Sequence, residues 1–284
     1  MKVFAPAKIN LFLEVLSRRN DGYHDIETLI VPIALFDELE ISLTEENIVE
    51  VVCDIKELSG TGNLVYKAVS LLKSLFPGKI GGVRVFLKKN IPVAAGLGGG
   101  SSDCAASVKF LNTECNLGLS DGKLREISSK LGADVPFFID TKSAVCHGIG
   151  DILKPFEIGF KMHFLLVNPN VTLSTAESYT SLKSFLTGQT KSINILLRSL
   201  KNHDIENSAK NMFNRLQGVC EKKIPFVTDI IDALYKNSAL KAMVSGSGPT
   251  VFGLYRTASD AQRAKTSILE HYGSKISIFV VESF

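Results

Sequence analysis

The sequence predicts an α+β protein with two domains. Two observations lead to this class. After residue 240 the pattern is two short strands, a helix and a strand, which is typical of an antiparallel sheet covered by helices on one side. At 284 residues and 45% hydrophobic content, the chain is also long enough for two moderate cores. The pattern changes after Asp151, which places a boundary within 152–160 and divides the chain into 1–155 and 156–284.

The first elements are strands. Apolar residues alternate with other residues over 9–15, and alternation of this kind is typical of a strand. The triplet 20–22 (Asn-Asp-Gly) predicts a turn, and further strands are predicted at 27–34, 38–44 and 48–53.

Helices follow. Apolar residues recur at helical spacing from Asn63 to Leu75, and an alternating strand over 83–87 precedes a helix-compatible run over 104–111. Ser120 is expected to cap a helix that Gly132 ends.

The second half mixes both types. A strand is predicted at 162–167, and helical stretches at 175–186, 192–200 and 205–235. The tail is predicted as strands at 241–244 and 250–255, a helix at 259–271 and a strand at 275–281.

Composition excludes several classes. The net charge of +3 is too small for a nucleic-acid surface, and the lysine pairs 88–89 and 222–223 are expected to be solvated. Five cysteines without CxxC spacing predict reduced thiols and no structural zinc, and the histidines form no metal-binding pair. Charges at Lys8 and Glu14 exclude a normal signal peptide, and no uncharged apolar run is long enough to span a membrane. A cytoplasmic protein is expected.

The segment 92–102 is rich in glycine and lies between a predicted strand and a predicted helix. Glycine allows positive φ, so such a loop can turn its N–H groups toward one point, and a helix N-terminus adds further donors. Together they predict a phosphate site. Neither the Walker A lysine nor the third glycine of a dinucleotide motif is present. The predicted nucleotide-binding residues are Pro92, Val93, Ala94, Ala95, Gly96, Leu97, Gly98, Gly99, Gly100, Ser101 and Ser102.

Two charged residues lie in apolar surroundings. Lys8 follows Ala7 and precedes Ile9 on a predicted strand, and Asp134 lies within the apolar stretch 132–138. Each needs a partner if it is buried. If the two meet, the lysine would keep the aspartate ionised and help to neutralise a transferred phosphoryl group. A structural ion pair, with Asp134 capping the next short helix, is the open alternative.

Two further motifs have two interpretations each. The second glycine loop, 244–250, lies between two predicted strands and could be a simple hairpin or could fold against the first loop. Tyr23 and His24, just after a turn, could stack on and hydrogen-bond a heterocycle, or could be ordinary core or surface residues.

In this order the motifs resemble the GHMP kinase superfamily, and within it the branch that acts on a cytidyl diphosphate substrate of the non-mevalonate isoprenoid pathway. The resemblance covers nearly the whole chain and rests on the segments 5–11, 21–24, 92–106, 132–137 and 245–252. It implies a two-domain fold with ATP and substrate in a cleft between the domains. It also implies transfer of a phosphoryl group to the 2-hydroxyl group of a methylerythritol moiety.

The resemblance also implies residue roles. Lys8 and Asp134 match catalytic residues, with Asp134 as base, and 92–102 match the loop that holds the ATP phosphates. Asn63 matches a residue near the adenosine. The residues that match substrate-binding positions are Asn10, Tyr23, His24, Thr175 and Tyr179. Mg²⁺ is expected, held mainly by phosphates, water and Ser101, with no dedicated protein metal site.

Two departures from the family pattern are the bulkier 93–95 (Val-Ala-Ala) and 211–213, where Asn-Met-Phe replaces Asn-Asp-Phe. Neither removes a catalytic group. Two alternatives stay open at this point. One is another GHMP kinase, for homoserine, mevalonate or a sugar, and the other is a non-catalytic ATP-binding regulator. A monomer or weak homodimer is expected.

Overall fold

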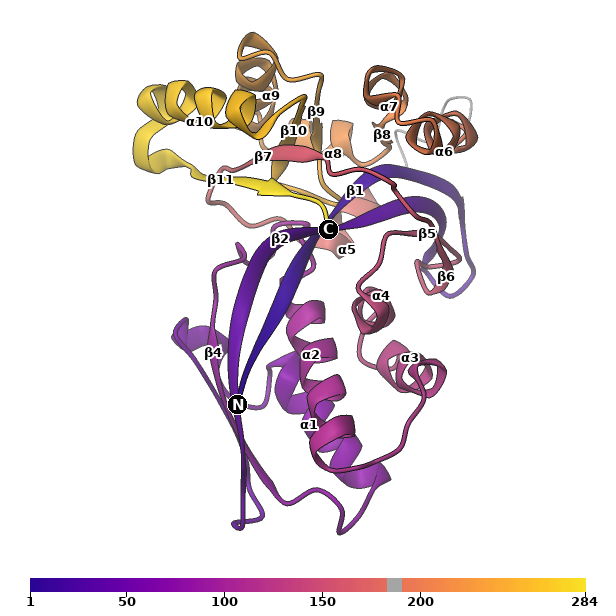
Figure 1. The fold of residues 1–284 in the computed structure, drawn as a ribbon, viewed down its shortest axis with the longest axis vertical. Coiled ribbons are helices and arrows are strands. Elements are labelled where there is room, and N and C mark those ends of the chain that lie inside the picture. Colours follow the sequence, from indigo (N-terminus) through magenta and orange to yellow (C-terminus); the bar gives the residue numbers. More distant parts are fainter. Residues whose placement is uncertain (183–190) are drawn as a thin grey trace. The chain divides into compact units, whose positions relative to one another are not determined.

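The structure is a computed structural model that describes residues 1–182 and 191–284. It forms two compact units, each built from several segments (Figure 1). The first unit contains Met1–Ala7, Leu35–Val93 and Gly98–Thr141, and the second contains Lys8–Ala34, Ala94–Leu97 and Lys142–Phe284. The long strands β1 (Lys2–Arg18) and β2 (His24–Thr44) contribute residues to both. The predicted division at residue 155 stays a prediction.

The first unit pairs a sheet with helices. Strand β4 (Gly82–Lys88) runs antiparallel to β2 and parallel to β3 (Val49–Cys53), so the strand order is β3-β4-β2-β1. Alternate residues of β4 are buried, as the alternation over 83–87 predicts. The helices and the short 3-10 turn are α1 (Leu64–Leu75), α2 (Gly99–Glu114), α3 (Asp121–Ser129), α4 (Val135–Asp140) and η1 (Lys56–Leu58).

Local signals set most of the helix starts. The side chain of Asn63 accepts a hydrogen bond from Val65 N at 2.8 Å and caps α1, and Ser120 caps α3 as predicted. Gly132 does not end α3, because the helix already ends at Ser129. Helix α2 begins at Gly99, five residues before the predicted run, because Gly98 adopts a left-handed φ of 72° that turns the chain directly into the helix.

The second unit contains a four-stranded sheet in the order β11-β7-β10-β9. It is antiparallel, as the tail pattern predicts. Helices α9 and α10 lie on one face of this sheet (Figure 1). The strands are β7 (His163–Asn168), β9 (Lys241–Val244), β10 (Val251–Tyr255) and β11 (Ser277–Glu282). The helices are α5 (Thr175–Ser181), α6 (Asn194–Lys201), α7 (Ile205–Asn211), α8 (Gln217–Lys223), α9 (Phe226–Lys236) and α10 (Ala258–Tyr272), with the 3-10 turn η3 (Gly273–Lys275).

The rest of the second unit is built on the parts of β1 and β2 that lie within Lys8–Ala34. The short strand β8 (Phe213–Asn214) pairs parallel with β1, and β5 (Ala144–His147) pairs antiparallel with β2. Strand β6 (Ile152–Pro155) completes a hairpin with β5 that the sequence patterns did not predict. A small core of Leu13, Val15, Ile26, Leu182, Leu216 and Val219 holds α8 to these strands.

Two predicted elements differ from the observed ones. The strands predicted at 27–34 and 38–44 form the single strand β2, because the chain stays extended through 35–37. The helical stretch 205–235 is three helices, because 213–214 pair with β1 and Pro225 begins a new helix. Of the helix predicted at 175–186, residues 175–181 are helical and 183–186 lie outside the described residues. The α+β class is confirmed.

Candidate active site

Lys8 is a buried cation of the second unit. Its residue is 5% exposed, and its Nζ donates to Oδ1 of Asn10 at 2.7 Å, so the predicted need for a partner is met. The amide of Asn10 donates in turn to Oγ1 of Thr28 at 2.8 Å, and that hydroxyl donates to the carbonyl oxygen of Phe12 at 2.6 Å. A chain of three hydrogen bonds therefore links the ammonium group of Lys8 to the backbone carbonyl of Phe12.

The second glycine loop folds against the first. Ser245 Oγ donates to the carbonyl oxygen of Gly96 at 3.0 Å, and the backbone of Thr250 bonds that of Ala95 at 3.3 Å. A Cβ on Gly96 would lie 2.1 Å from the carbonyl oxygen of Ser245, so only glycine fits this approach. The loop 244–250 also joins the antiparallel strands β9 and β10, so it is a hairpin that folds against the first loop, and both interpretations hold.

Lys8 lies beside this contact between the loops. A Cβ on Gly246, whose φ is +56°, would lie 3.1 Å from Asn10 Oδ1, 3.3 Å from Lys8 Nζ and 3.3 Å from the carbonyl oxygen of Gly96. The second loop is itself anchored, because Asn214 donates to the carbonyl oxygens of Val244 and Gly246 at 2.8 Å each. An ammonium group, a carboxamide and backbone of two glycine loops therefore converge in the second unit.

The predicted substrate residues lie on β1, β2 and α5 of the second unit, except Tyr23, which directly precedes β2. His24 and Tyr179 stack with ring centroids 5.3 Å apart, and the hydroxyls of Thr175 and Ser247 lie 3.0 Å apart. Burial lowers the pKa of His24 from its usual range, with a smaller contribution from Arg18. Tyr23 is 59% exposed. His24 thus meets Tyr179, and Thr175 meets the second glycine loop.

In the first unit, the start of α2 offers hydrogen-bond donors. Ser102 N bonds the carbonyl oxygen of Gly98 at 2.9 Å, so the amides of Gly99, Gly100 and Ser101 have no acceptor within the helix. The hydroxyl of Ser102 is also buried and has no hydrogen-bond partner among the residues that the structure describes. These groups suit an anionic ligand.

Asp134 and Asn63 also belong to the first unit. Asp134 is half-buried at the N-cap position of α4, yet its side chain makes no capping hydrogen bond, so capping does not explain it. Asn63 uses both ends of its amide locally, since Nδ2 donates to the carbonyl oxygen of Leu58 at 2.7 Å while Oδ1 caps α1. That Asp134 acts with Lys8, and that Asn63 lies near an adenosine, stay predictions.

Lys89 departs from its predicted place. Its side chain is only 4% exposed and pairs with Asp37 and Asp103, which are 0% and 2% exposed, whereas Lys88 is solvated as predicted. The alternation of β4 could have predicted that Lys89 is buried. Residues 83, 85 and 87 are buried on one face, and continuing the alternation places residue 89 on that face. A pair of lysines in sequence therefore points to opposite sides of the sheet.

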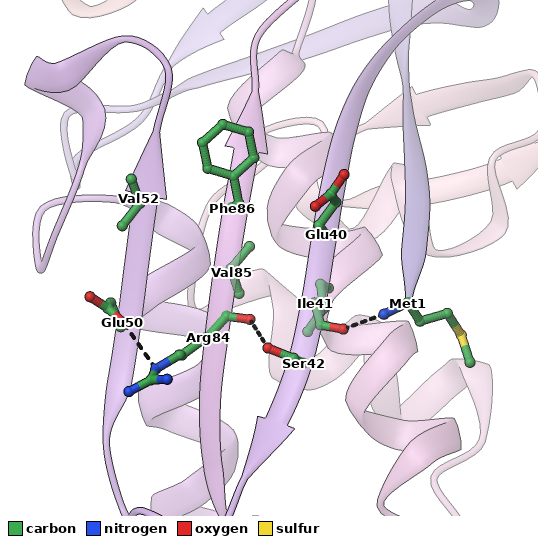
Figure 2. Close-up of a pocket in the computed structure, with 9 residues that line it drawn as sticks. All are labelled: Met1, Glu40, Ile41, Ser42, Glu50, Val52, Arg84, Val85 and Phe86. Carbon is green, nitrogen blue, oxygen red and sulfur yellow. Dashed lines mark hydrogen bonds and ion pairs between the residues drawn. The ribbon is translucent and has the colours of Figure 1, made fainter.

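The first unit also has a shallow pocket of about 400 Å³ on the sheet face away from α1 and α2 (Figure 2). Arg84 crosses the pocket and pairs with Glu50 at 3.1 Å. The ring of Phe86 and the side chain of Val52, both half-exposed, lie beside this pair. None of the predicted site residues is among the residues that line it.

Comparison with known proteins identifies the family. The patterns of the GHMP kinases N terminal domain and the GHMP kinases C terminal domain match residues 63–142 and 196–274. A 4-diphosphocytidyl-2-C-methyl-D-erythritol kinase of Pelobacter propionicus is 40% identical over 270 residues, which are 95% of this chain and 94% of that protein. A crystal structure of a 4-(cytidine 5'-diphospho)-2C-methyl-D-erythritol kinase superposes with a TM-score of 0.85 and 30% identity, covering 100% of this chain and 99% of the other.

Homoserine kinase from Cytophaga hutchinsonii shares the fold, with a TM-score of 0.78 and 18% identity over 100% of this chain and 94% of the other. At that identity the likeness extends to the fold alone. No helix among residues 1–182 and 191–284 has the length and apolar character needed to cross a bilayer. From its matched domains and its full-length relatives, the chain belongs to the GHMP kinases, and within them to the ATP-dependent 4-diphosphocytidyl-2-C-methyl-D-erythritol kinases, which phosphorylate an alcohol group.

Proposed function

We propose that this chain transfers the γ-phosphoryl group of ATP to the 2-hydroxyl group of 4-diphosphocytidyl-2-C-methyl-D-erythritol, with Asp134 as the base and Lys8 as its electrostatic partner. The carboxylate of Asp134 accepts the hydroxyl proton while the oxygen forms its bond to the γ-phosphorus. The bond between that phosphorus and the bridging oxygen breaks, and ADP leaves with the electron pair. The reaction belongs to the non-mevalonate route to isoprenoid precursors.

One observation supports the proposal most directly. The ammonium group of Lys8 lies beside Gly246 of the second glycine loop, whose neighbour Ser245 bonds Gly96 of the first. Phosphoryl transfer needs a cation where negative charge develops, and a buried, hydrogen-bonded ammonium group supplies it without reorganisation. A purely structural lysine would not need two glycine loops packed around it.

Residues of the second unit suit the substrate. At neutral pH the lowered pKa of His24 keeps its imidazole uncharged, with one nitrogen as donor and the other as acceptor. A neutral imidazole held by stacking on Tyr179 can hydrogen-bond the edge of a cytosine, and the exposed ring of Tyr23 can cover its face. Asn10 and Thr175 present polar groups suited to the hydroxyl-rich erythritol chain.

The start of α2 suits the nucleotide. The amides of residues 99–101, which have no acceptor within the helix, fit phosphate oxygens. The buried hydroxyl of Ser102, which has no partner among the described residues, fits a phosphate oxygen or the Mg²⁺ ion that accompanies it. When bound, Mg²⁺ would neutralise charge on the phosphates, with Ser101 or Ser102 as protein ligand. Asn63 is assigned to the adenosine end of ATP.

The proposal is tested by measuring ADP release with a coupled assay. We expect turnover with the cytidyl diphosphate substrate to exceed that with methylerythritol phosphate, which lacks the nucleotide, by about a hundredfold or more in kcat/KM. Homoserine and mevalonate serve as further controls. Equal turnover of the substrates with and without the cytidyl group would overturn the assignment of Tyr23 and His24, and ATP binding without turnover on any alcohol would favour a regulator.

A further inference from the structure

Three buried ionisable side chains lie beneath the glycine-rich segment in the first unit, and the proposed reaction uses none of them. The ammonium group of Lys89 contacts Oδ2 of Asp37 and lies 2.7 Å from Oδ2 of Asp103. Their side chains are 4%, 0% and 2% exposed. Burying three ionisable groups costs several kcal/mol before the pairing is counted. A stability role alone is a weak reason for such a cluster, since apolar residues of similar volume would serve as well.

The two carboxylates act at opposite ends of the glycine-rich segment: Asp37, on β2, contacts the residues before it, and Asp103 follows it in sequence. Asp37 Oδ1 accepts hydrogen bonds from the backbone amides of Asn90 at 2.7 Å and Ile91 at 2.8 Å, so it holds the chain just before the segment. Asp103 lies in the first turns of α2, just after the segment. Lys89 contacts both, so a single ammonium group joins the entry and the exit of the segment.

The cluster also explains why residue 99 is a glycine. A Cβ on Gly99 would lie 3.2 Å from Lys89 Nζ, 3.2 Å from Asp37 Oδ2 and 3.1 Å from a methyl carbon of Ile91. Gly99 is the first residue of α2, and its amide is one of the free donors. The backbone that carries these donors therefore rests directly on the ion pair, and a shift of the pair would shift the donors.

We propose that Lys89 is a positioning residue for nucleotide binding. Through Asp37 and Asp103 it holds both flanks of the glycine-rich segment, and so presents the amides at the start of α2 to the phosphates of ATP. This inference rests on the proposed assignment of residues 92–102 to ATP. Donors that are preset in place bind an anion without an ordering cost, whereas a loose segment must be ordered at the moment of binding.

The test compares Lys89→Met with Lys88→Met. Both remove one ammonium group from adjacent positions, but Lys88 is solvated and pairs with Glu38 at 3.3 Å. ADP affinity is measured by calorimetry, and the KM for the cytidyl substrate is measured at saturating ATP. We expect Lys89→Met to weaken ADP binding by about tenfold or more while the substrate KM stays within about twofold, and Lys88→Met to change neither beyond about twofold.

Two further variants keep the test decisive if Lys89→Met does not fold. Asp103→Asn preserves side-chain volume and removes one carboxylate, so it should weaken ADP binding with the same selectivity. Lys89→Arg keeps the charge and should recover part of the affinity. The proposal is overturned if folded variants bind ADP within about twofold of wild type, or if ADP and substrate are weakened equally. ADP binding needs no turnover, so this outcome is independent of whether the cytidyl compound is the substrate.

Discussion

Lys8 Nζ donates a 2.7 Å hydrogen bond to Oδ1 of Asn10, two residues further along the same face of β1. The orientation of the Asn10 amide is set from its other end, where Nδ2 donates to the hydroxyl of Thr28 at 2.8 Å. That hydroxyl is committed as a donor to the carbonyl oxygen of Phe12. The place of the ammonium group in the second unit therefore depends on a hydroxyl group two hydrogen bonds away.

Thr28→Val tests this dependence. Valine has nearly the same shape but leaves the buried Nδ2 of Asn10 without an acceptor, which should cost about 1–3 kcal/mol of unfolding free energy. If Lys8 is catalytic, kcat should fall by about tenfold as the amide reorients, with the KM for ATP little changed. Thr28→Ser retains the hydroxyl and should keep most of the activity. Steady-state kinetics and urea unfolding check both, and a Thr28→Val enzyme with wild-type kcat would refute the dependence.

Asp134→Asn should abolish catalysis and leave the fold intact. The proposed general base contributes about 10²–10⁴ in rate, and the amide cannot accept the hydroxyl proton. The amide keeps the size of the side chain, and the substitution removes no capping hydrogen bond from α4. Asp140→Asn is the matched control, because Asp140 lies at the end of the same helix and pairs with Arg125 at 2.7 Å. The control should retain its kcat, and a fully active Asp134→Asn enzyme would rule out the base.

Gly246→Ala separates backbone strain from crowding of the site. Gly246 and Gly273 both have φ of +56°, but a Cβ at Gly246 meets Asn10, Gly96 and Lys8 within 3.3 Å, whereas one at Gly273 meets nothing within 4 Å. Both alanine variants should lose about 1–3 kcal/mol of stability, because a positive φ strains any residue with a side chain, and Gly273 has in addition a ψ of −135°, outside the left-handed helical region. Only Gly246→Ala should also lose most of its kcat. Equal activity in the two variants would show that the second loop is not part of the site.

The buried cluster predicts a pH dependence of stability. Burial, opposed by Lys89 and reinforced by Asp37, raises the pKa of Asp103 from 3.8 to about 7. In the folded chain the carboxyl group of Asp103 therefore stays protonated up to about pH 7, whereas in the unfolded chain it loses its proton near pH 4. Between about pH 4 and pH 7 the folded state binds more protons, so this group's contribution to stability is complete below pH 4 and is lost as pH rises toward 7.

Asp103→Asn removes this titration, because asparagine mimics the protonated acid. The difference in unfolding free energy, wild type minus variant, should therefore fall as the pH is raised from 4 to 7, and denaturant titrations at several pH values measure it. Carboxylates that do not interact with Asp103 contribute equally to both proteins and cancel in the difference. A difference that is independent of pH would show that Asp103 is ionised throughout this range.

Much of the architecture was determined by local sequence signals. The alternation over 9–15, the caps at Asn63 and Ser120, and the strand-strand-helix-strand tail all depend on neighbours a few residues away, and the structure confirms each of them. The family follows from sequence as well, because its motifs are short and contiguous.

Other features were decided only by tertiary structure. The charge pattern at 88–89 predicted two solvated lysines, yet Lys89 is buried because Asp37 and Asp103, 52 and 14 residues away in sequence, accept its hydrogen bonds. The packing of Ser245 on Gly96, 149 residues apart, is likewise a long-range contact. Periodicity and capping report the free energy of a segment by itself, whereas burial of a charge is decided by which distant partners the folded chain brings to it.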